Sequence, residues 1–320
     1  MKRVLIASDI VNPSRSGEIF PRLKKLKSGG GVCFSICETA ISEEMESFTR
    51  EERDEKFSEL RTLLIGFGVD HVLKHIGEPL LRDFSGEIVK EEFVAWGDVR
   101  LDVRDNLCGD FYENFSRKRN RAYAAREKCS SGELGECLKE FLNEDFPKKW
   151  YPEEIRTRKI STLEGYFDAV VDFWWFDTIV ENSIMCERVK NALASSPLSS
   201  EVLFALKKKI VEEDRLNSEL SKRVWCEKKI LFDDVSSCKP VSVYYRSLRS
   251  LVRQILSAAS VRFVEKKNLI NLPEYMVQMR NKDVLLTENR GIVRTMFNEV
   301  FSEVREKRIM TLSELEVEMA

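Results

Sequence analysis

One long segment in the second half of the chain has the pattern of an apolar helix without a clear polar face. Apolar side chains recur at helical spacing from residue 163 to residue 189 and cover most of the circumference of a helix. Such a helix must be surrounded by other elements, so we predict that it is the central helix of a helical part. Ser161 and Glu164 have the spacing of a capping box at its start. The apolar set consists of Leu163, Tyr166, Phe167, Val170, Trp174, Ile179, Met185 and Val189.

The N-terminal segment predicts a short β-α-β unit. An apolar strand over Val4–Ile10 is followed by a turn, by a helix over Glu18–Lys27, and by a second strand over Val32–Ile36. We expect the two strands to pair in parallel. Thr49 and Glu52 then have the spacing of a capping box, which predicts that the next helix begins there.

The remainder of the chain is dominated by helical spacing. Strict alternation of apolar and charged residues over Trp96–Asp105 predicts one more half-buried strand, and an amphipathic helix is predicted after Pro197. The predicted fold is mainly α-helical with a small N-terminal α/β portion, which is α+β overall. We place a small α/β domain at 1–130 and a helical domain, built round the buried aromatic helix, at 150–320.

Composition and charge limit the class of protein. The chain has 320 residues and 43% hydrophobic residues, which excludes a wholly disordered chain. Lys and Arg number 52 against 54 Asp and Glu, so attraction to nucleic acid or to anionic lipid would have to be local. The apolar run near the N-terminus is too short for a signal peptide, and no stretch is long enough to span a membrane. We therefore expect an intracellular protein without a membrane partner, whose eight scattered cysteines are free thiols.

Positive charge is concentrated in two stretches. Between Arg117 and Lys128 six cations face only Glu127, and between Lys239 and Arg308 there are 14 Lys and Arg against 7 Asp and Glu. Three interpretations remain open: solvated helix faces, a surface that binds phosphate groups of a nucleic acid, and a surface for an acidic protein partner. The candidate contact residues are Arg117, Lys118, Arg119, Arg121 and Tyr123 in the first stretch and Arg246, Arg249 and Arg253 in the second.

Metal and cofactor sites are not indicated by spacing. His71 and His75 would share one face of a helix, but Cys33 and Cys37 lie in a predicted strand, where thiols four residues apart cannot hold one ion. We expect neither a metal nor a cofactor.

Three aspartates of the central segment could have raised pKa values in apolar surroundings. We favour the simpler interpretation that they mark the solvent side or pair with arginine. They are Asp168, Asp172 and Asp177.

The loop after the first strand is a candidate ligand site, because parallel sheets bind ligands beyond the carboxyl ends of their strands. Its polar residues are Asp9, Asn12, Ser14 and Ser16. The chain has neither G-x-G-x-x-G nor G-x-x-x-x-G-K-[ST]. In position, the strand ending at Ser8-Asp9 resembles the start of metallophosphoesterase-like domains. Val11 stands where those domains have histidine, and no Asn-His or Gly-His pair follows.

The sequence favours a non-catalytic subunit or adaptor of an intracellular assembly, with protein partners and with nucleic acid as a candidate partner of its basic helical surfaces. The alternative is an enzyme, or a degenerate enzyme, that acts on a nucleotide or phosphoester at the N-terminal α/β unit, with no catalytic residue assigned. A third hypothesis is a purely structural adaptor whose cations are paired internally.

Overall fold

The structure is a computed structural model that describes most of the chain. The described residues are 2–11, 16–45, 48–75, 93–101, 107–146, 151, 153–193, 223, 225–227, 239–257, 272–280, 282–288, 291–301 and 308–320. For some of them, including 107–112 and 181–193, only the backbone is described.

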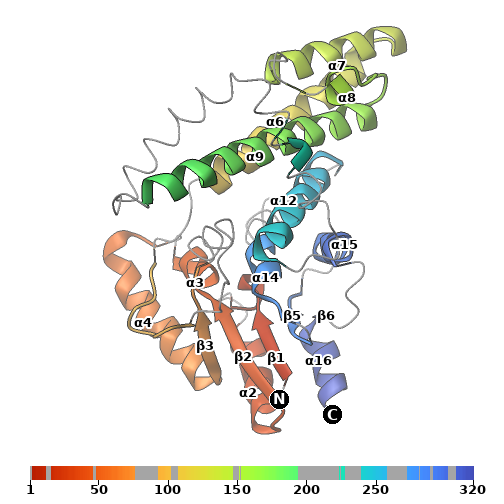
Figure 1. The fold of residues 1–320 in the computed structure, drawn as a ribbon. Coiled ribbons are helices and arrows are strands. Elements are labelled where there is room, and N and C mark those ends of the chain that lie inside the picture. Colours follow the sequence, from red (N-terminus) through yellow and green to blue (C-terminus); the bar gives the residue numbers. More distant parts are fainter. Residues whose placement is uncertain are drawn as a thin grey trace.

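A single sheet is formed by strands from both ends of the chain (Figure 1). Its order is β4-β3-β2-β1-β5-β6, and all neighbours are parallel except β3 and β4. In the centre, Val4 of β1 is in register with Phe34 of β2 and with Val284 of β5. The strands are β1 (Lys2–Ile6), β2 (Val32–Cys37), β3 (Val69–Leu73), β4 (Phe93–Val94), β5 (Val284–Leu286) and β6 (Arg308–Met310).

Helices of both chain ends pack around this sheet. α3 packs against β2, α4 packs against β3, and the C-terminal helix α16 packs against α2. Arg22 of α2 holds Glu316 of α16 through two hydrogen bonds of 2.9 and 2.6 Å. These helices are α1 (Ser8–Val11), α2 (Ser16–Ser28), α3 (Glu38–Met45), α4 (Arg50–Gly66), α15 (Gly291–Val300) and α16 (Leu312–Met319).

The remaining helices form a second part beyond the carboxyl edge of the sheet (Figure 1). α12 links the two parts, because it contacts α6 and α9 on one side and α14 and α15 on the other. The helices of this part are α6 (Leu107–Lys128), α7 (Ser131–Asp145), α8 (Glu153–Arg156), α9 (Leu163–Leu193), α12 (Pro240–Ser257) and α14 (Leu272–Gln278). The predicted fold class is thereby confirmed, since the chain is mainly helical with one small mixed sheet.

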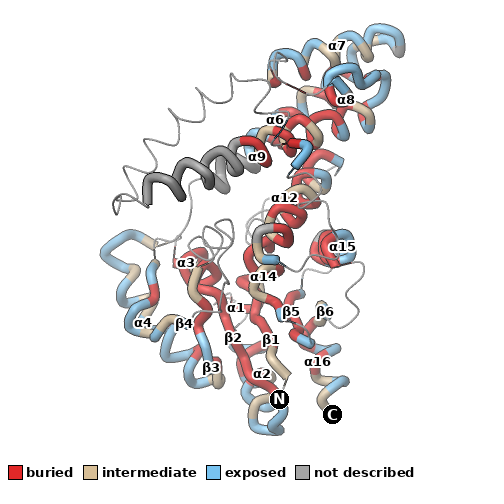
Figure 2. Tube along the Cα trace, in the orientation of Figure 1, coloured by how far each residue is buried: buried red, intermediate tan, exposed pale blue. Residues whose placement is uncertain are grey.

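The predicted buried aromatic helix is α9. Tyr166, Phe173 and Trp175 are at most 1% exposed, and Tyr151 packs edge-on against Phe173 with ring centroids 4.5 Å apart. Buried residues also fill β1 and β2, whereas α4 and α7 are largely exposed (Figure 2). Over residues 163–180, the apolar residues of α9 therefore form the core of the helical part, as the pattern predicted. The side chains of Met185 and Val189, the last two of the predicted set, lie outside the described ones.

Several local predictions are confirmed. β1 and β2 pair in parallel, α2 covers the predicted first helix, and Thr49 and Glu52 form the predicted capping box of α4. The first strand is shorter than predicted, because β1 ends at Ile6 and the chain turns into α1 at Ser8.

The predicted strand over 96–105 is wrong in its described part. Residues 96–101 form a turn and an irregular segment, since Asp98 N–H donates to the carbonyl of Ala95 over 2.8 Å. The Arg100 N–H donates to the Glu38 carboxylate over 2.7 Å, and the Ser42 hydroxyl donates to the Leu101 carbonyl over 3.0 Å. These bonds replace strand pairing. The rest of that segment, and the predicted helix after Pro197, lie outside the described residues.

Two further predictions need correction or extension. α9 begins one residue later than predicted, because the Thr162 hydroxyl, and not that of Ser161, accepts a hydrogen bond from Gly165 N–H over 3.1 Å. β5 and β6 lie within the range predicted to be the helical domain, yet they extend the N-terminal sheet. That 1–130 and 150–320 fold independently remains a prediction.

Over the described residues, the helices are all too short or too polar to cross a lipid bilayer.

Candidate ligand site at the carboxyl edge of the sheet

The strand order places a crossover between β1 and β5. The chain runs outward from β1 through β2 to β3, and after the helical segments it returns to the other side of β1 with β5 and β6. In parallel sheets of this kind, ligands bind beyond the carboxyl ends of the two strands on either side of such a crossover. The residues that follow Ile6 in β1 and Leu286 in β5 are therefore the candidate site.

Asp9 joins the two sides of this crossover. Its Oδ2 accepts hydrogen bonds from the Thr287 hydroxyl over 2.9 Å and from the Glu288 N–H over 2.8 Å. Beneath it, the Ala7 N–H donates to the Leu286 carbonyl over 3.1 Å and extends the pairing of β1 with β5. The carboxylate is thus fixed at the mouth of the crossover, in the half-buried position expected of a ligand-facing group.

Glu288 continues this network toward the C-terminus. Its side chain is exposed, and one of its carboxylate oxygens accepts the Leu312 N–H at the start of α16 over 3.1 Å. A carboxylate at the N-terminal end of a helix is favoured because the backbone N–H groups there carry partial positive charge. The crossover is therefore connected to the last helix of the chain.

Tyr275 of α14 closes the site from the helical side. Its hydroxyl accepts the Ser8 N–H over 3.0 Å, and its side chain is buried. Burial raises the pKa of Tyr275 well above its ordinary value, with smaller contributions from Cys37 and Glu43. The phenol therefore stays neutral, and its proton remains a hydrogen-bond donor at the carboxyl end of β1.

A second carboxylate follows β2. Glu38 is 1% exposed, and its oxygens accept the N–H groups of His75 over 3.1 Å and of Arg100 over 2.7 Å. It fixes the segments that follow β3 and β4, so its role is positioning. Glu38 was not among the predicted site residues, although it follows an apolar strand directly, as Asp9 follows the first strand.

The described part of this edge is acidic and rich in acceptors. Asp9 and Glu288 can accept hydrogen bonds from hydroxyl or amino groups of a ligand. Nowhere in the described ranges do three or more His, Cys, Asp or Glu side chains gather in an arrangement that could hold a metal ion. Of the other predicted loop residues, Ser16 begins α2, while Asn12 and Ser14 lie outside the described residues.

The first basic stretch lies on α6, and the fold engages several of its cations. The Lys118 ammonium is buried 3.0 Å from Asp145, and Arg121 pairs with Glu144 while lying over the ring of Phe141. Arg119 donates to the carbonyl of Ile255 at the end of α12, as a cation at a helix C-terminus is expected to do.

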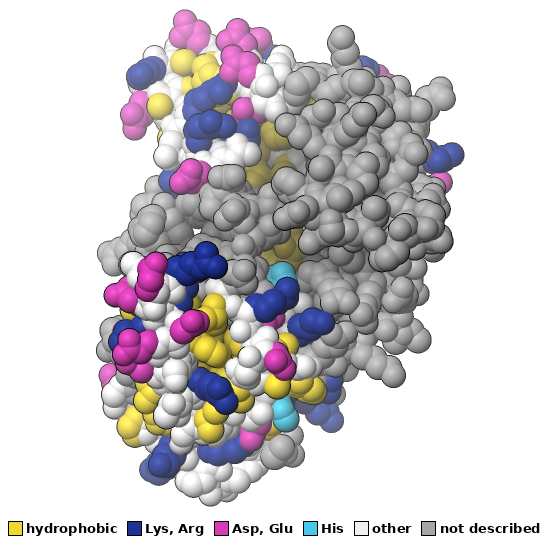
Figure 3. Space-filling model, turned by 90° about the vertical axis from the view of Figure 1, so that its left-hand side faces the viewer, with side chains coloured by type: hydrophobic (Ala, Val, Ile, Leu, Met, Phe, Trp, Pro, Cys, Tyr) yellow, Lys and Arg dark blue, Asp and Glu magenta, His cyan; other side chains and the backbone are white. Residues whose placement is uncertain are grey.

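Other members of that stretch are differently placed. The ring of Tyr123 packs against Phe167, whereas Arg117, Arg126 and Lys128 are exposed and have no ion pair with any described residue. One side of the molecule shows basic and acidic side chains interspersed (Figure 3).

The second basic stripe, Arg246, Arg249 and Arg253, lies on α12, and its three side chains have different surroundings. Arg246 is buried, and Arg249 pairs with Asp172 of α9 over 3.4 Å and lies over the Trp175 ring. Arg253 is exposed. The three residues therefore differ in their access to a partner.

The remaining polar candidates have structural surroundings. His71 lies on β3 with its ring tilted against that of Phe93, and His75 follows the strand, so the two do not share a helix face. Asp172 pairs with Arg158 and Arg249, which agrees with the expected pairing to arginine. Asp177 accepts the Tyr151 hydroxyl over 2.8 Å, and Asp168 is exposed. The described cysteines are free: Cys33, Cys37, Cys129, Cys137 and Cys226.

Comparisons with protein-family models, with curated proteins and with solved structures gave no significant match. The class of protein is therefore defined by topology: a mainly parallel α/β sheet with a crossover beside its first strand, interrupted between β4 and β5 by a helical part.

Proposed function

We propose that this chain binds a nucleotide or a related phosphoester at the crossover between β1 and β5. The observation that carries the proposal is the position of Asp9, which follows β1 directly and is held by Thr287 and Glu288 from β5. Asp9 and the exposed Glu288 would accept hydrogen bonds from the hydroxyl or amino groups of the ligand, as acidic residues accept from ribose hydroxyls in sheets of this class.

The helical part also contacts the proposed ligand site. The Tyr275 hydroxyl of α14 accepts the Ser8 N–H just after β1, and α12 contacts α14 as well as α6 and α9. A ligand at the carboxyl edge would therefore lie between the sheet and the helices. Sites between two such parts are common for small ligands, because both parts can contribute contacts.

The test is binding of AMP, ATP, GTP and NAD to the full chain, measured as a rise in the melting temperature and then by titration calorimetry. A ligand at about 100 times its dissociation constant stabilises the folded state by about 2.7 kcal/mol. We expect Asp9→Asn to abolish the response. Asp70→Asn is the matched control, because Asp70 lies near the opposite, amino end of β3.

If all four compounds fail to shift the melting temperature, or if Asp9→Asn responds like the unaltered chain, the site is not at this crossover. Release of inorganic phosphate or nucleoside from a bound compound, measured in the same samples, separates an enzyme from a binding protein.

A second candidate function is that of an adaptor for an acidic partner such as a nucleic acid. It is favoured by the exposed cations Arg117, Arg126 and Lys128 on α6, which the described fold leaves unpaired. Binding of labelled single-stranded RNA and DNA should weaken steeply with salt and should be lost in the double variant Arg117→Glu/Arg126→Glu. Unchanged binding by this variant would exclude α6 as the contact surface.

A further inference from the structure

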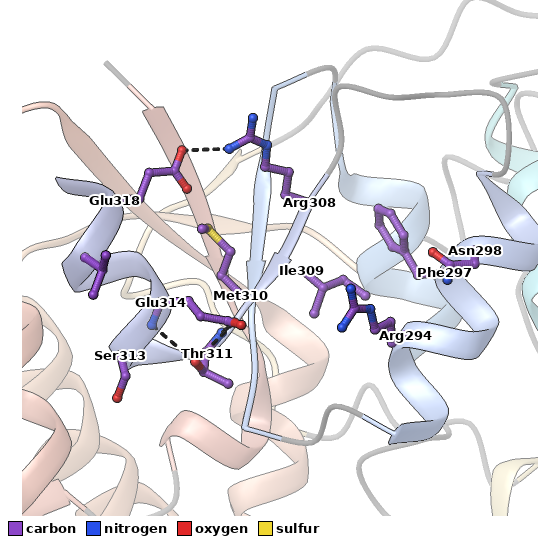
Figure 4. Close-up of a pocket in the computed structure, with 11 residues that line it drawn as sticks. Arg294, Phe297, Asn298, Arg308, Ile309, Met310, Thr311, Ser313, Glu314 and Glu318 are labelled. Carbon is purple, nitrogen blue, oxygen red and sulfur yellow. Dashed lines mark hydrogen bonds and ion pairs between the residues drawn. The ribbon is translucent and has the colours of Figure 1, made fainter.

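A groove opens at the outer edge of the sheet, between α15 and α16 and along β6 (Figure 4). It has a volume of about 630 Å³. α15 contributes Arg294 and Phe297 to one wall, and α16 contributes Glu314 and Val317 to the other. This groove lies on the β6 side of β5, whereas Asp9 lies on the β1 side, and Thr287 is hydrogen-bonded to both Asp9 and Met310.

The floor of the groove is an edge strand with one residue turned outward. Arg308 N–H donates to the Asp283 carbonyl over 3.2 Å, and the Met310 carbonyl accepts from Thr287 N–H over 3.0 Å. Since parallel strands bond alternate residues to one neighbour, the backbone N–H and C=O of Ile309 point away from β5. β6 is the last of the described strands in the sheet order, so these two groups face away from the other described strands.

The walls supply apolar surface next to this backbone edge. Ile309 and Met310 are half-buried, and Phe297 is buried beside them. Val317 of α16 is 80% exposed and lines the groove together with these apolar side chains. A backbone edge beside a groove with apolar side chains is an arrangement to which extended peptides add as a further strand.

The charges of the lining indicate which peptide fits. Arg308 pairs with Glu318 over 2.9 Å, and Glu314 accepts the Thr311 N–H over 2.9 Å in the capping box of α16. Arg294 is exposed and forms no ion pair with the described residues, so it is the lining cation left without a counter-charge there. A ligand with a carboxylate would complement it.

We propose that this groove binds an extended peptide segment of a partner protein, which pairs with the outward backbone groups of Ile309 and places an acidic side chain against Arg294. Apolar side chains of the peptide would contact Phe297 and Val317, because alternate residues of a strand point to the same side. The proposal is independent of ligand binding at Asp9, which lies on the other side of β5.

The experiment is selection of a random heptapeptide phage library on the full chain, followed by anisotropy measurements with the enriched peptides. We expect enriched peptides with an acidic residue between β-branched or aromatic residues. Arg294→Glu should weaken their binding about tenfold or more, as for loss and reversal of a close charge pair. Ile309→Pro removes the outward N–H without removing a donor to β5, and it should abolish binding.

One control variant and one further variant of the groove make the result specific. Arg61→Glu places the same charge change on the exposed surface of α4 and should leave peptide binding unchanged. Val317→Lys alters only an exposed side chain, so it should weaken binding without affecting the melting temperature. Failure to enrich any peptide would overturn the proposal. So would peptide binding by Arg294→Glu and by Ile309→Pro that is as tight as binding by the unaltered chain. Concentration-dependent dimers that Ile309→Pro dissociates would show that a second copy occupies the edge instead.

Discussion

Cations on a single helix have opposite environments in this protein. On α6, Lys118 is 7% exposed and pairs with Asp145, whereas Arg117 beside it in sequence is exposed. Burial lowers the pKa of the Lys118 ammonium below its ordinary value, against the opposing hydrogen bond to Asp145. The sequence shows a run of positive charge, but only the positions of α7 and α12 decide which of these cations are engaged within the fold.

Replacing Lys118 by Met should destabilise the fold by about 3 kcal/mol, because it leaves the Asp145 carboxylate, whose side chain is only 14% exposed, without its ion-pair partner. Urea unfolding followed by tryptophan fluorescence measures the change. The double variant Lys118→Met/Asp145→Leu should regain most of the loss, since an apolar pair of similar size avoids the unpaired charge. Lys128→Met, at an exposed site on the same helix, should change the free energy of unfolding by less than about 0.5 kcal/mol. If Lys118→Met and Lys128→Met lowered the free energy of unfolding equally, a specific ion pair between Lys118 and Asp145 would be contradicted.

At the scale of elements, local signals were most informative where one side chain decides the structure. Thr49 and Glu52 correctly predicted the start of α4, because a capping box needs only residues within one turn. The pattern over 96–105 failed because Glu38 and Ser42, distant in sequence, bind its backbone. β5 was not predicted, since three residues are too few for a periodic signal.

The start of α9 offers a direct comparison of the predicted and the observed cap. Thr162→Ala should lower the free energy of unfolding by about 1 kcal/mol, because it removes the acceptor of the Gly165 N–H. Ser161→Ala should change it by less than about 0.5 kcal/mol, since Ser161 is exposed and lies one residue outside the cap. Chemical denaturation of the two variants in parallel measures the difference. A larger loss from Ser161→Ala would restore the cap predicted from the sequence.

The packing of α16 against α2 and β1 should weaken at acid pH. The hydrogen bond from Arg22 holds the pKa of Glu316 below its ordinary value of 4.5, and that from Lys2 does the same for Glu318. Because the folded pKa is the lower one, this stabilisation is complete above about pH 4.5 and is lost as pH falls through the folded pKa. Glu316→Gln should therefore lower the stability at pH 7 but have little effect at pH 3, in urea titrations at both values.

The exposed Glu136, which pairs with Lys139 within α7, provides the control for this pH experiment. Glu136→Gln should have a small effect at either pH, as expected of a solvent-exposed pair within one helix. A loss of stability from Glu316→Gln that is the same at pH 3 and pH 7 would contradict the role of its charge.

At the scale of the whole molecule, the sheet depends on residues from both ends of the chain. The N-terminal β-α-β unit and the mainly helical class could be predicted, because both are written in local periodicity. The site at the crossover could be predicted only in part. Asp9 was recognised, but Thr287 and Glu288 were not, because their proximity to Asp9 follows from the pairing of β5 with β1 across more than 270 intervening residues.

Whether 1–130 is an independent domain can be decided by expressing that fragment alone. Without β5, the buried strand β1 becomes a sheet edge, and without α9 and α12 the buried residues Phe115 and Ala122 of α6 lose their covering. We expect the fragment to unfold without a cooperative thermal transition and to bind a dye for exposed apolar surface, as monitored by circular dichroism and fluorescence. Adding residues 131–320 should restore the transition, because they supply β5, α9 and α12. A fragment that melts cooperatively by itself would instead confirm the predicted boundary and would mean that β5 and β6 attach to a sheet that is already stable.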